Sequence, residues 1–173
     1  MKIFINKIEN LDNRSKNESQ IPKWSQWTAS DNKNYIYGLS KEGRISNQRF
    51  GCDMDLQYAI LINHIHYIAD ICLKHYCNIN NIEKPFLPDH FSIRKYIPGA
   101  EMGNHVDSED PTDLKHPIIS GVFYLNDNYE GGEIEFSEQN IKLKPEAGSL
   151  IIFPSDRPFF HSPGKVISGN KYM

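Results

Sequence analysis

Hydrophobic and polar positions follow two different rhythms along this chain. Between residues 54 and 77, apolar side chains recur every three or four positions, which predicts one long amphipathic helix. From Phe91 onward, short apolar runs alternate with Gly, Pro, Asn and Asp, which predicts strands joined by turns. Residues 1–53, whose early part is rich in Asn, Ser and Lys, are predicted to form an N-terminal extension. The helical stripe consists of Tyr58, Leu61, Ile65, Ile68 and Cys72.

The predicted strands are short and numerous, which favours a sandwich or barrel over alternating βαβ units. The expected fold class is therefore mainly β, a jelly roll with the long helix packed on it. The predicted strands cover residues 91–97, 103–106, 118–125, 133–136, 141–144, 149–153, 159–161 and 165–167.

Length and composition set the outer limits. With 173 residues and 39% hydrophobic content, the chain can bury one core, so 1–173 is predicted to be a single domain with the β core at 91–173. The net charge of −3 gives no general attraction for nucleic acid, which is disfavoured as a partner. No apolar run approaches the roughly 20 residues that span a bilayer, and the N-terminus lacks a signal-peptide pattern. We therefore expect a cytoplasmic protein with no membrane association.

A metal site is indicated by three side chains. His105 and Asp107 are two positions apart, so on a strand both would leave from the same face. His161 is the candidate third ligand, because it completes the 2-His-1-carboxylate triad of non-haem Fe(II) oxygenases. On spacing alone, His105 could also be a surface histidine and Asp107 a turn residue before the acidic loop 108–113.

The predicted helix carries three more histidines. No carboxylate or cysteine accompanies them at a ligand spacing, so we interpret them as surface or packed side chains. They are His64, His66 and His75.

Oxygenases with such a triad need electrons from a second substrate. The oxo acid 2-oxoglutarate supplies them when a cation holds its distal carboxylate. Lys171, ten residues after His161, is the candidate cation, and its rival Lys165 falls in the turn after Pro163-Gly164. Because the sequence stops at Met173, the strand that holds Lys171 is expected to fray.

A hydroxyl and a phenol are predicted to lie near this cation. In a strand that begins near Ser120, the side chains of Ser120, Val122 and Tyr124 share one face. Ser120 and Tyr124 are therefore predicted to point into the barrel beside Lys171.

From Phe91 onward the sequence resembles the Fe(II)/2-oxoglutarate-dependent dioxygenases, most closely their prolyl 4-hydroxylase-like branch. This resemblance implies a double-stranded β-helix, and it implies that Tyr124 and Lys171 bind the distal carboxylate of 2-oxoglutarate. Tyr96 is implied to lie near the co-substrate and the iron. The matching pieces are Tyr96 before His105-Val-Asp107, Gly121 to Asp127, Glu130-Gly-Gly-Glu133, Pro145 to Phe153, and His161 to Lys171.

The function that follows is hydroxylation of a C–H bond with release of succinate and CO2. The implied cofactors are Fe(II), 2-oxoglutarate and O2, with ascorbate as an optional addition. A peptidyl residue, proline first by resemblance, is the leading substrate, and a small molecule is next. Two alternatives stay open: a nucleic-acid dealkylase of the same superfamily, and a non-catalytic jelly-roll binding module.

Overall fold

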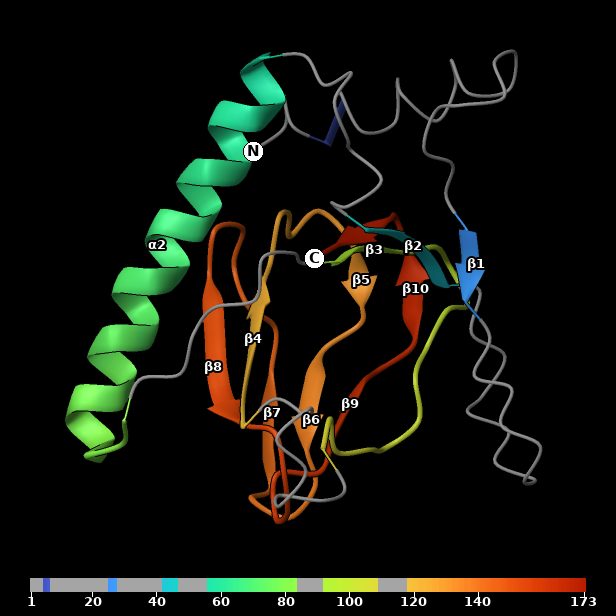
Figure 1. Ribbon diagram of the computed structural model, residues 1–173. Helices are drawn as coiled ribbons and strands as arrows, with labels where there is room; N and C mark the ends of the chain where they lie inside the picture. Colours follow the sequence, from blue (N-terminus) through green and yellow to red (C-terminus); the bar gives the residue numbers. More distant parts are fainter. Residues whose placement is uncertain (1–4, 7–24, 28–41, 47–55, 84–91, 109–117) are drawn as a thin grey trace.

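The computed structural model describes residues 5–6, 25–27, 42–46, 56–83, 92–108 and 118–173 (Figure 1). Most of the predicted N-terminal extension, the first two residues of the predicted helix and the acidic loop beyond Ser108 lie outside these ranges.

The one long helix, α2, runs from Leu56 to Asn80 and lies along β8 (Leu150–Pro154) on one side of the strands (Figure 1). It buries Leu73 and Cys77. Its C-terminus lies three residues beyond the predicted end, because Asn81 takes a left-handed conformation with φ 55° and the Ile82 amide donates to the Cys77 carbonyl. Of the helices in the described ranges, none combines the length and hydrophobicity that crossing a membrane requires.

The strands pair in four antiparallel groups, so the described part of the chain is mainly β. One sheet has the order β1-β2-β3-β11, another has the order β7-β6-β9, and β4 pairs with β8 and β10 with β5. The remaining bounds are β1 Ser25–Trp27, β2 Glu42–Ser46, β3 Ser92–Tyr96, β4 Ile119–Phe123, β5 Glu130–Gly131, β6 Ile134–Phe136, β7 Ile141–Leu143, β9 His161–Pro163, β10 Val166–Ser168 and β11 Lys171–Tyr172.

One predicted strand is wrong. Residues 103–106 do not form a ladder, and only His105 makes an isolated antiparallel bridge, to His161. The segment bends at Gly99, whose φ is +86°, and then bonds irregularly to the chain around β9 and β10. The Gly99 amide donates to the Val166 carbonyl and the Met102 amide to the Pro163 carbonyl. The uneven spacing of these hydrogen bonds breaks the alternating pattern of hydrogen-bonded pairs that an antiparallel ladder requires.

The described residues form two apolar clusters. The first consists of Tyr124, Ile134, Phe136 and Phe153, with Val122, Ile151 and Phe159 packed against it. The second consists of Tyr96, Ala100 and Val166, with Ile97 and Met173 packed against it.

Candidate metal centre and co-substrate pocket

The backbone joins His105 and His161 directly. The His105 amide donates to the His161 carbonyl over 2.9 Å, and the His161 amide donates to the His105 carbonyl over 2.8 Å. On its other side His161 pairs with Phe136 of β6. Its ring is packed against those of Phe136 and Phe153, with centroids 5.8 and 4.7 Å away. The two histidines are therefore held side by side by the sheet.

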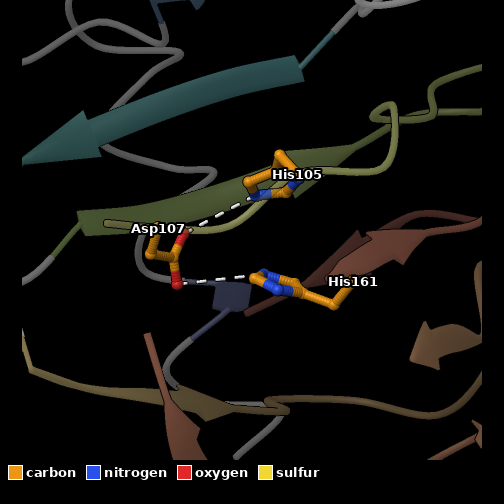
Figure 2. Close-up of side chains that lie close together, drawn as sticks. All are labelled: His105, Asp107 and His161. Atoms are coloured by element: carbon orange, nitrogen blue, oxygen red, sulfur yellow. Dashed lines mark ion pairs between the residues drawn. The ribbon is translucent and has the colours of Figure 1, made fainter. Parts of the chain in front are cut away.

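Asp107 faces both imidazoles, and each ring points its edge toward the Asp107 carboxylate (Figure 2). Oδ1 of Asp107 is 3.6 Å from Nε2 of His105, and Oδ2 is 3.8 Å from Nε2 of His161. One ligand atom from each residue lies within 4.8 Å of the other two. Among the residues that the structure describes, this is the one group of three such side chains close enough to share an ion.

The remaining polar atoms of the triad have protein partners. Nδ1 of His105 is 2.8 Å from the Gly103 carbonyl oxygen, and Nδ1 of His161 is 3.1 Å from the Phe159 carbonyl oxygen. A carbonyl only accepts, so these contacts assign the ring proton to Nδ1 and leave both Nε2 lone pairs free for a metal. The hydroxyl of Ser120 donates to Oδ2 of Asp107.

The pKa shifts of Asp107 and His161 favour the protonation states in which these side chains bind a metal. Burial raises the pKa of Asp107, but hydrogen bonding with His105 and Ser120 and the charges of the two histidines outweigh burial and lower this pKa to about 2. Burial and then His105 lower the pKa of His161. At neutral pH the site therefore presents an anionic carboxylate and an uncharged His161 imidazole.

This donor set fits Fe(II). Two imidazole nitrogens and one carboxylate oxygen on one face form the triad that leaves further coordination positions open in non-haem iron oxygenases. Asp107 keeps 30% of its side chain exposed, so the centre is reachable from solvent on the Asp107 side.

Lys171 lies opposite Tyr96. It belongs to β11, which pairs with β3 so that Lys171 and Tyr96 are direct partners, and side chains of such partners share one face. The Lys171 side chain is completely buried, and its Nζ donates to the Gly132 carbonyl over 2.7 Å. Burial lowers the pKa of Lys171 to about 8, although the Glu133 charge acts in the opposite direction.

The expected fraying of the strand that holds Lys171 is not observed. The Met173 amide and carbonyl both bond to Arg94, and the Leu125 amide donates to the Tyr172 carbonyl. Asn126 adds a side-chain clamp, because its Oδ1 accepts from the Tyr172 amide and its Nδ2 donates to the Asn170 carbonyl. β11 is therefore held from both sides.

Three aromatic rings surround the Lys171 ammonium. Its Nζ lies 5.4 Å from the ring centroid of Tyr96, 5.2 Å from that of Tyr124 and 5.9 Å from that of Tyr129. Tyr124 was predicted beside this cation, and Tyr96 was implied to lie near the co-substrate and the iron. Tyr129 was not predicted here, although its position three residues before Gly132 in the Glu130-Gly-Gly-Glu133 piece could have indicated it.

The other predicted residues lie elsewhere. Ser120 is at the metal centre and contacts Asp107, whereas it was expected beside Lys171. Lys165 is exposed, in contrast to the buried Lys171. His64 and His75 are exposed on α2, and among the described residues neither belongs to a metal-binding group.

A family model matches the segment that carries these residues. Residues 91–173 match the model described as the 2OG-Fe(II) oxygenase superfamily, and this segment contains the triad, Lys171 and the three tyrosines.

Curated relatives match a shorter segment. The alpha-ketoglutarate-dependent dioxygenase AlkB of Escherichia coli is 31% identical over 77 residues, which are 44% of this chain and 35% of that protein. AlkB of Salmonella typhimurium is 30% identical over the same shares. The chain spans about a third of the length of these relatives.

Solved structures share the fold. A viral collagen prolyl hydroxylase of Paramecium bursaria Chlorella virus-1, in a 2OG complex, has a TM-score of 0.58 and 21% identity over 76% of this chain and 75% of that one. A Trichoplax adhaerens prolyl hydroxylase, in complex with a hypoxia inducible factor peptide fragment, has a TM-score of 0.63 and 16% identity over 95% and 72%. Residues 91–173 of this chain thus match the 2OG-Fe(II) oxygenase superfamily, and this match implies Fe(II), 2-oxoglutarate and O2 as cofactors.

Proposed function

We propose that this protein is an Fe(II)- and 2-oxoglutarate-dependent dioxygenase that hydroxylates a C–H bond. The observation that carries the proposal is a three-ligand centre with open positions in the same fold as a buried lysine, Lys171. A closed structural metal site takes four protein ligands and has no use for a separate buried cation. The proposal includes a double-stranded β-helix as the arrangement of the four antiparallel groups of strands.

Each residue has a separate task in this proposal. His105, Asp107 and His161 hold the metal, and Ser120 keeps the Asp107 carboxylate oriented. Lys171 and Tyr124 hold the distal carboxylate of the oxo acid, and Tyr96 bounds the same pocket. The protein thereby sets the orientation of the oxo acid relative to the metal.

When bound, the metal would activate O2, which is the oxidant, and the oxo acid would supply two of the four electrons that O2 accepts. One oxygen atom of O2 goes to the substrate C–H bond, which becomes C–OH. The other goes to the oxo acid, which leaves as succinate and CO2. Ascorbate serves only to return oxidised metal to Fe(II).

The proposed substrate is a peptidyl residue, with proline first. Support comes from the solved structures, which are prolyl hydroxylases, one of them bound to a peptide fragment. A Pseudomonas putida prolyl-4-hydroxylase adds a TM-score of 0.55 at 19% identity, over 95% of this chain and 79% of that one.

A nucleic-acid dealkylase is the second candidate. The curated relatives are dioxygenases named AlkB, so the comparisons do not support the expectation that nucleic acid is disfavoured as a partner. The net charge of −3 argues only against general electrostatic attraction.

The first experiment measures succinate formation from 2-oxoglutarate after O2 is admitted to the protein loaded with Fe(II) under anaerobic conditions. His105→Ala, Asp107→Ala and His161→Ala should abolish turnover and keep the fold, whereas His75→Ala on the exposed face of α2 should turn over like the unaltered protein. Full turnover in a triad variant would overturn the assignment of the three ligands. Absence of both succinate formation and metal binding in the unaltered protein would contradict the proposal as a whole. A non-catalytic binding module would then be the better reading.

The second experiment separates the substrate classes. Proline-containing peptides and methylated single-stranded DNA are offered to the Fe(II)-loaded protein, and the products are weighed by mass spectrometry. A peptide that gains one oxygen supports the prolyl hydroxylase assignment. Loss of a methyl group from the DNA, with no change in the peptides, would favour the dealkylase.

A further inference from the structure

Tyr129 is buried beside Lys171, and the proposed function gives it no task. Only 4% of its surface is exposed. A side chain added at Gly132 would place its Cβ 3.2 Å from Cε2 of Tyr129 and 3.3 Å from Cδ of Lys171. Cε2 neighbours the carbon that bears the hydroxyl, so the hydroxyl end of the ring and the lysine side chain meet over the same glycine.

The Tyr129 hydroxyl has no hydrogen-bond partner within the part of the chain that the structure describes. Leaving a buried hydroxyl unsatisfied destabilises the folded state. The Lys171 ammonium has three N–H donors, of which one is given to the Gly132 carbonyl. Lys171 and Tyr129 therefore hold more hydrogen-bond donors than the acceptors that the described residues give them.

The charges around Tyr129 keep its hydroxyl protonated. Burial and then the carboxylates of Asp127 and Glu133 raise the pKa of Tyr129 to about 12. Burial, followed by the neighbouring phenols of Tyr129 and Tyr96, raises the pKa of Tyr124. Tyr129 thus presents a neutral O–H donor at physiological pH.

Glu133 is a carboxylate that acts on both Tyr129 and Lys171 through its charge alone. Among the described residues, neither of these two side chains forms a hydrogen bond or ion pair with it. An acceptor brought in from outside would satisfy the Tyr129 hydroxyl and the free donors of Lys171 together.

We propose that the Tyr129 hydroxyl donates to the distal carboxylate of the oxo acid, as a second contact beside Lys171 that selects dicarboxylic over monocarboxylic oxo acids. This inference rests on the proposed function, since it assumes that an oxo acid binds in the pocket. A carboxylate accepts up to about four hydrogen bonds, so it can use both the ammonium and the phenol.

The test replaces Tyr129 by Phe in the full chain loaded with Mn(II), and calorimetry measures the binding of 2-oxoglutarate and of 2-oxopentanoate. The second acid has the same chain length without the distal carboxylate. Loss of a hydrogen bond to a charged group should weaken 2-oxoglutarate binding about 10- to 100-fold. The binding of 2-oxopentanoate should stay within about twofold, and Tyr67→Phe, on the exposed face of α2, should alter neither affinity.

Thermal unfolding of the ligand-free variant provides the second readout. Removing an unsatisfied hydroxyl should leave the melting temperature unchanged or raise it, whereas removing a structural hydrogen bond should lower it. Equal weakening of both acids, unchanged 2-oxoglutarate affinity, or a lower melting temperature would overturn the assignment to Tyr129. Failure of the unaltered Mn(II)-loaded protein to bind 2-oxoglutarate would instead overturn the proposed function and this inference with it.

Discussion

At the scale of single residues, the site depends on polar contacts between side chains far apart in the sequence. Ser120 and Asp107 are 13 positions apart, and Lys171 reaches a carbonyl 39 positions away. Each contact orients a group that the proposed chemistry needs: a carboxylate ligand in the first case and an ammonium in the second. Single substitutions at these positions therefore separate metal binding from co-substrate binding.

Ser120→Ala should weaken metal binding and leave the fold intact. The hydroxyl orients Asp107 and contributes to its low pKa, and loss of such an outer partner typically lowers metal affinity about 10- to 100-fold. Calorimetric titration with Mn(II) measures the change, with Ser162→Ala as the control for a serine beside a ligand but without this contact. Equal Mn(II) affinities in Ser120→Ala and the unaltered protein would show that Asp107 does not need this orientation.

Binding of 2-oxoglutarate should weaken as pH rises above about 8. Burial lowers the pKa of Lys171 to about 8, so the ammonium that pairs with the distal carboxylate loses its proton above that pH. The affinity should be constant below pH 7 and fall by up to about tenfold per pH unit above 8. In Lys171→Arg, whose guanidinium stays charged, the profile should be flat across this range. A flat profile in the unaltered protein would mean that another group binds the carboxylate.

At the scale of elements, short antiparallel strands bring the two halves of the site together. β9 carries His161 between His105 and β6, and β11 carries Lys171 opposite Tyr96 of β3. The turn at Gly131-Gly132 lets β5 approach the segment around β10 closely, since a Cβ at Gly131 would lie 2.3 Å from the Lys165 carbonyl oxygen. The pocket around Lys171 therefore depends on backbone that only glycine permits.

Two glycine variants separate backbone strain from crowding of the pocket. Gly132 and Gly148 both have positive φ, +67° and +92°, so alanine at either position should cost on the order of 1–3 kcal/mol of stability. Only Gly132→Ala places a methyl group against Tyr129 and Lys171, whereas nothing lies within 4 Å of the added atom at Gly148.

We expect Gly132→Ala to weaken 2-oxoglutarate binding at least tenfold and Gly148→Ala to leave it unchanged. Denaturant unfolding measures the loss of stability in both variants, and calorimetry measures their affinity for 2-oxoglutarate. Equal affinities in the two variants would show that the pocket adapts to the extra methyl group.

At the scale of the whole molecule, the described part of the chain joins one helix to a mainly β unit that carries the site (Figure 1). The metal centre joins segments around residues 105, 120 and 161, and the Lys171 pocket joins β3, β11 and the turn after β5. A ligand that contacts several of these segments at once should stabilise the whole folded state.

The metal and the oxo acid should together raise the melting temperature. A ligand present at 100 times its dissociation constant adds about 2.7 kcal/mol, which corresponds to roughly 5–10 °C for a protein of this size. 2-Oxoglutarate should have little effect without Mn(II), since its oxo acid end needs the metal. Differential scanning fluorimetry tests this, and the same shift in His161→Ala would show that the oxo acid binds outside the triad.

Much of the fold was predictable because its signals are local. The period of apolar residues predicted the long helix, and alternation with turn residues predicted most strands of the β core to within two or three residues. The end of α2 and the segment 103–106 were predicted wrongly, because a left-handed Asn81 and irregular bonds to β9 and β10 decide them. The pattern of hydrophobic residues indicates neither the left-handed residue nor the irregular hydrogen bonds.

The sequence by itself determined which three side chains form the candidate triad and which lysine is the candidate cation, since these residue types and spacings have few other uses. The tertiary structure alone decided their partners. It placed Ser120 on Asp107 rather than beside Lys171, clamped β11 through Asn126, and put Tyr129 beside the ammonium. The physical reason is that side-chain partners across a sheet are set by strand register and by the path of the connecting turns, which join positions too far apart for any local pattern to record.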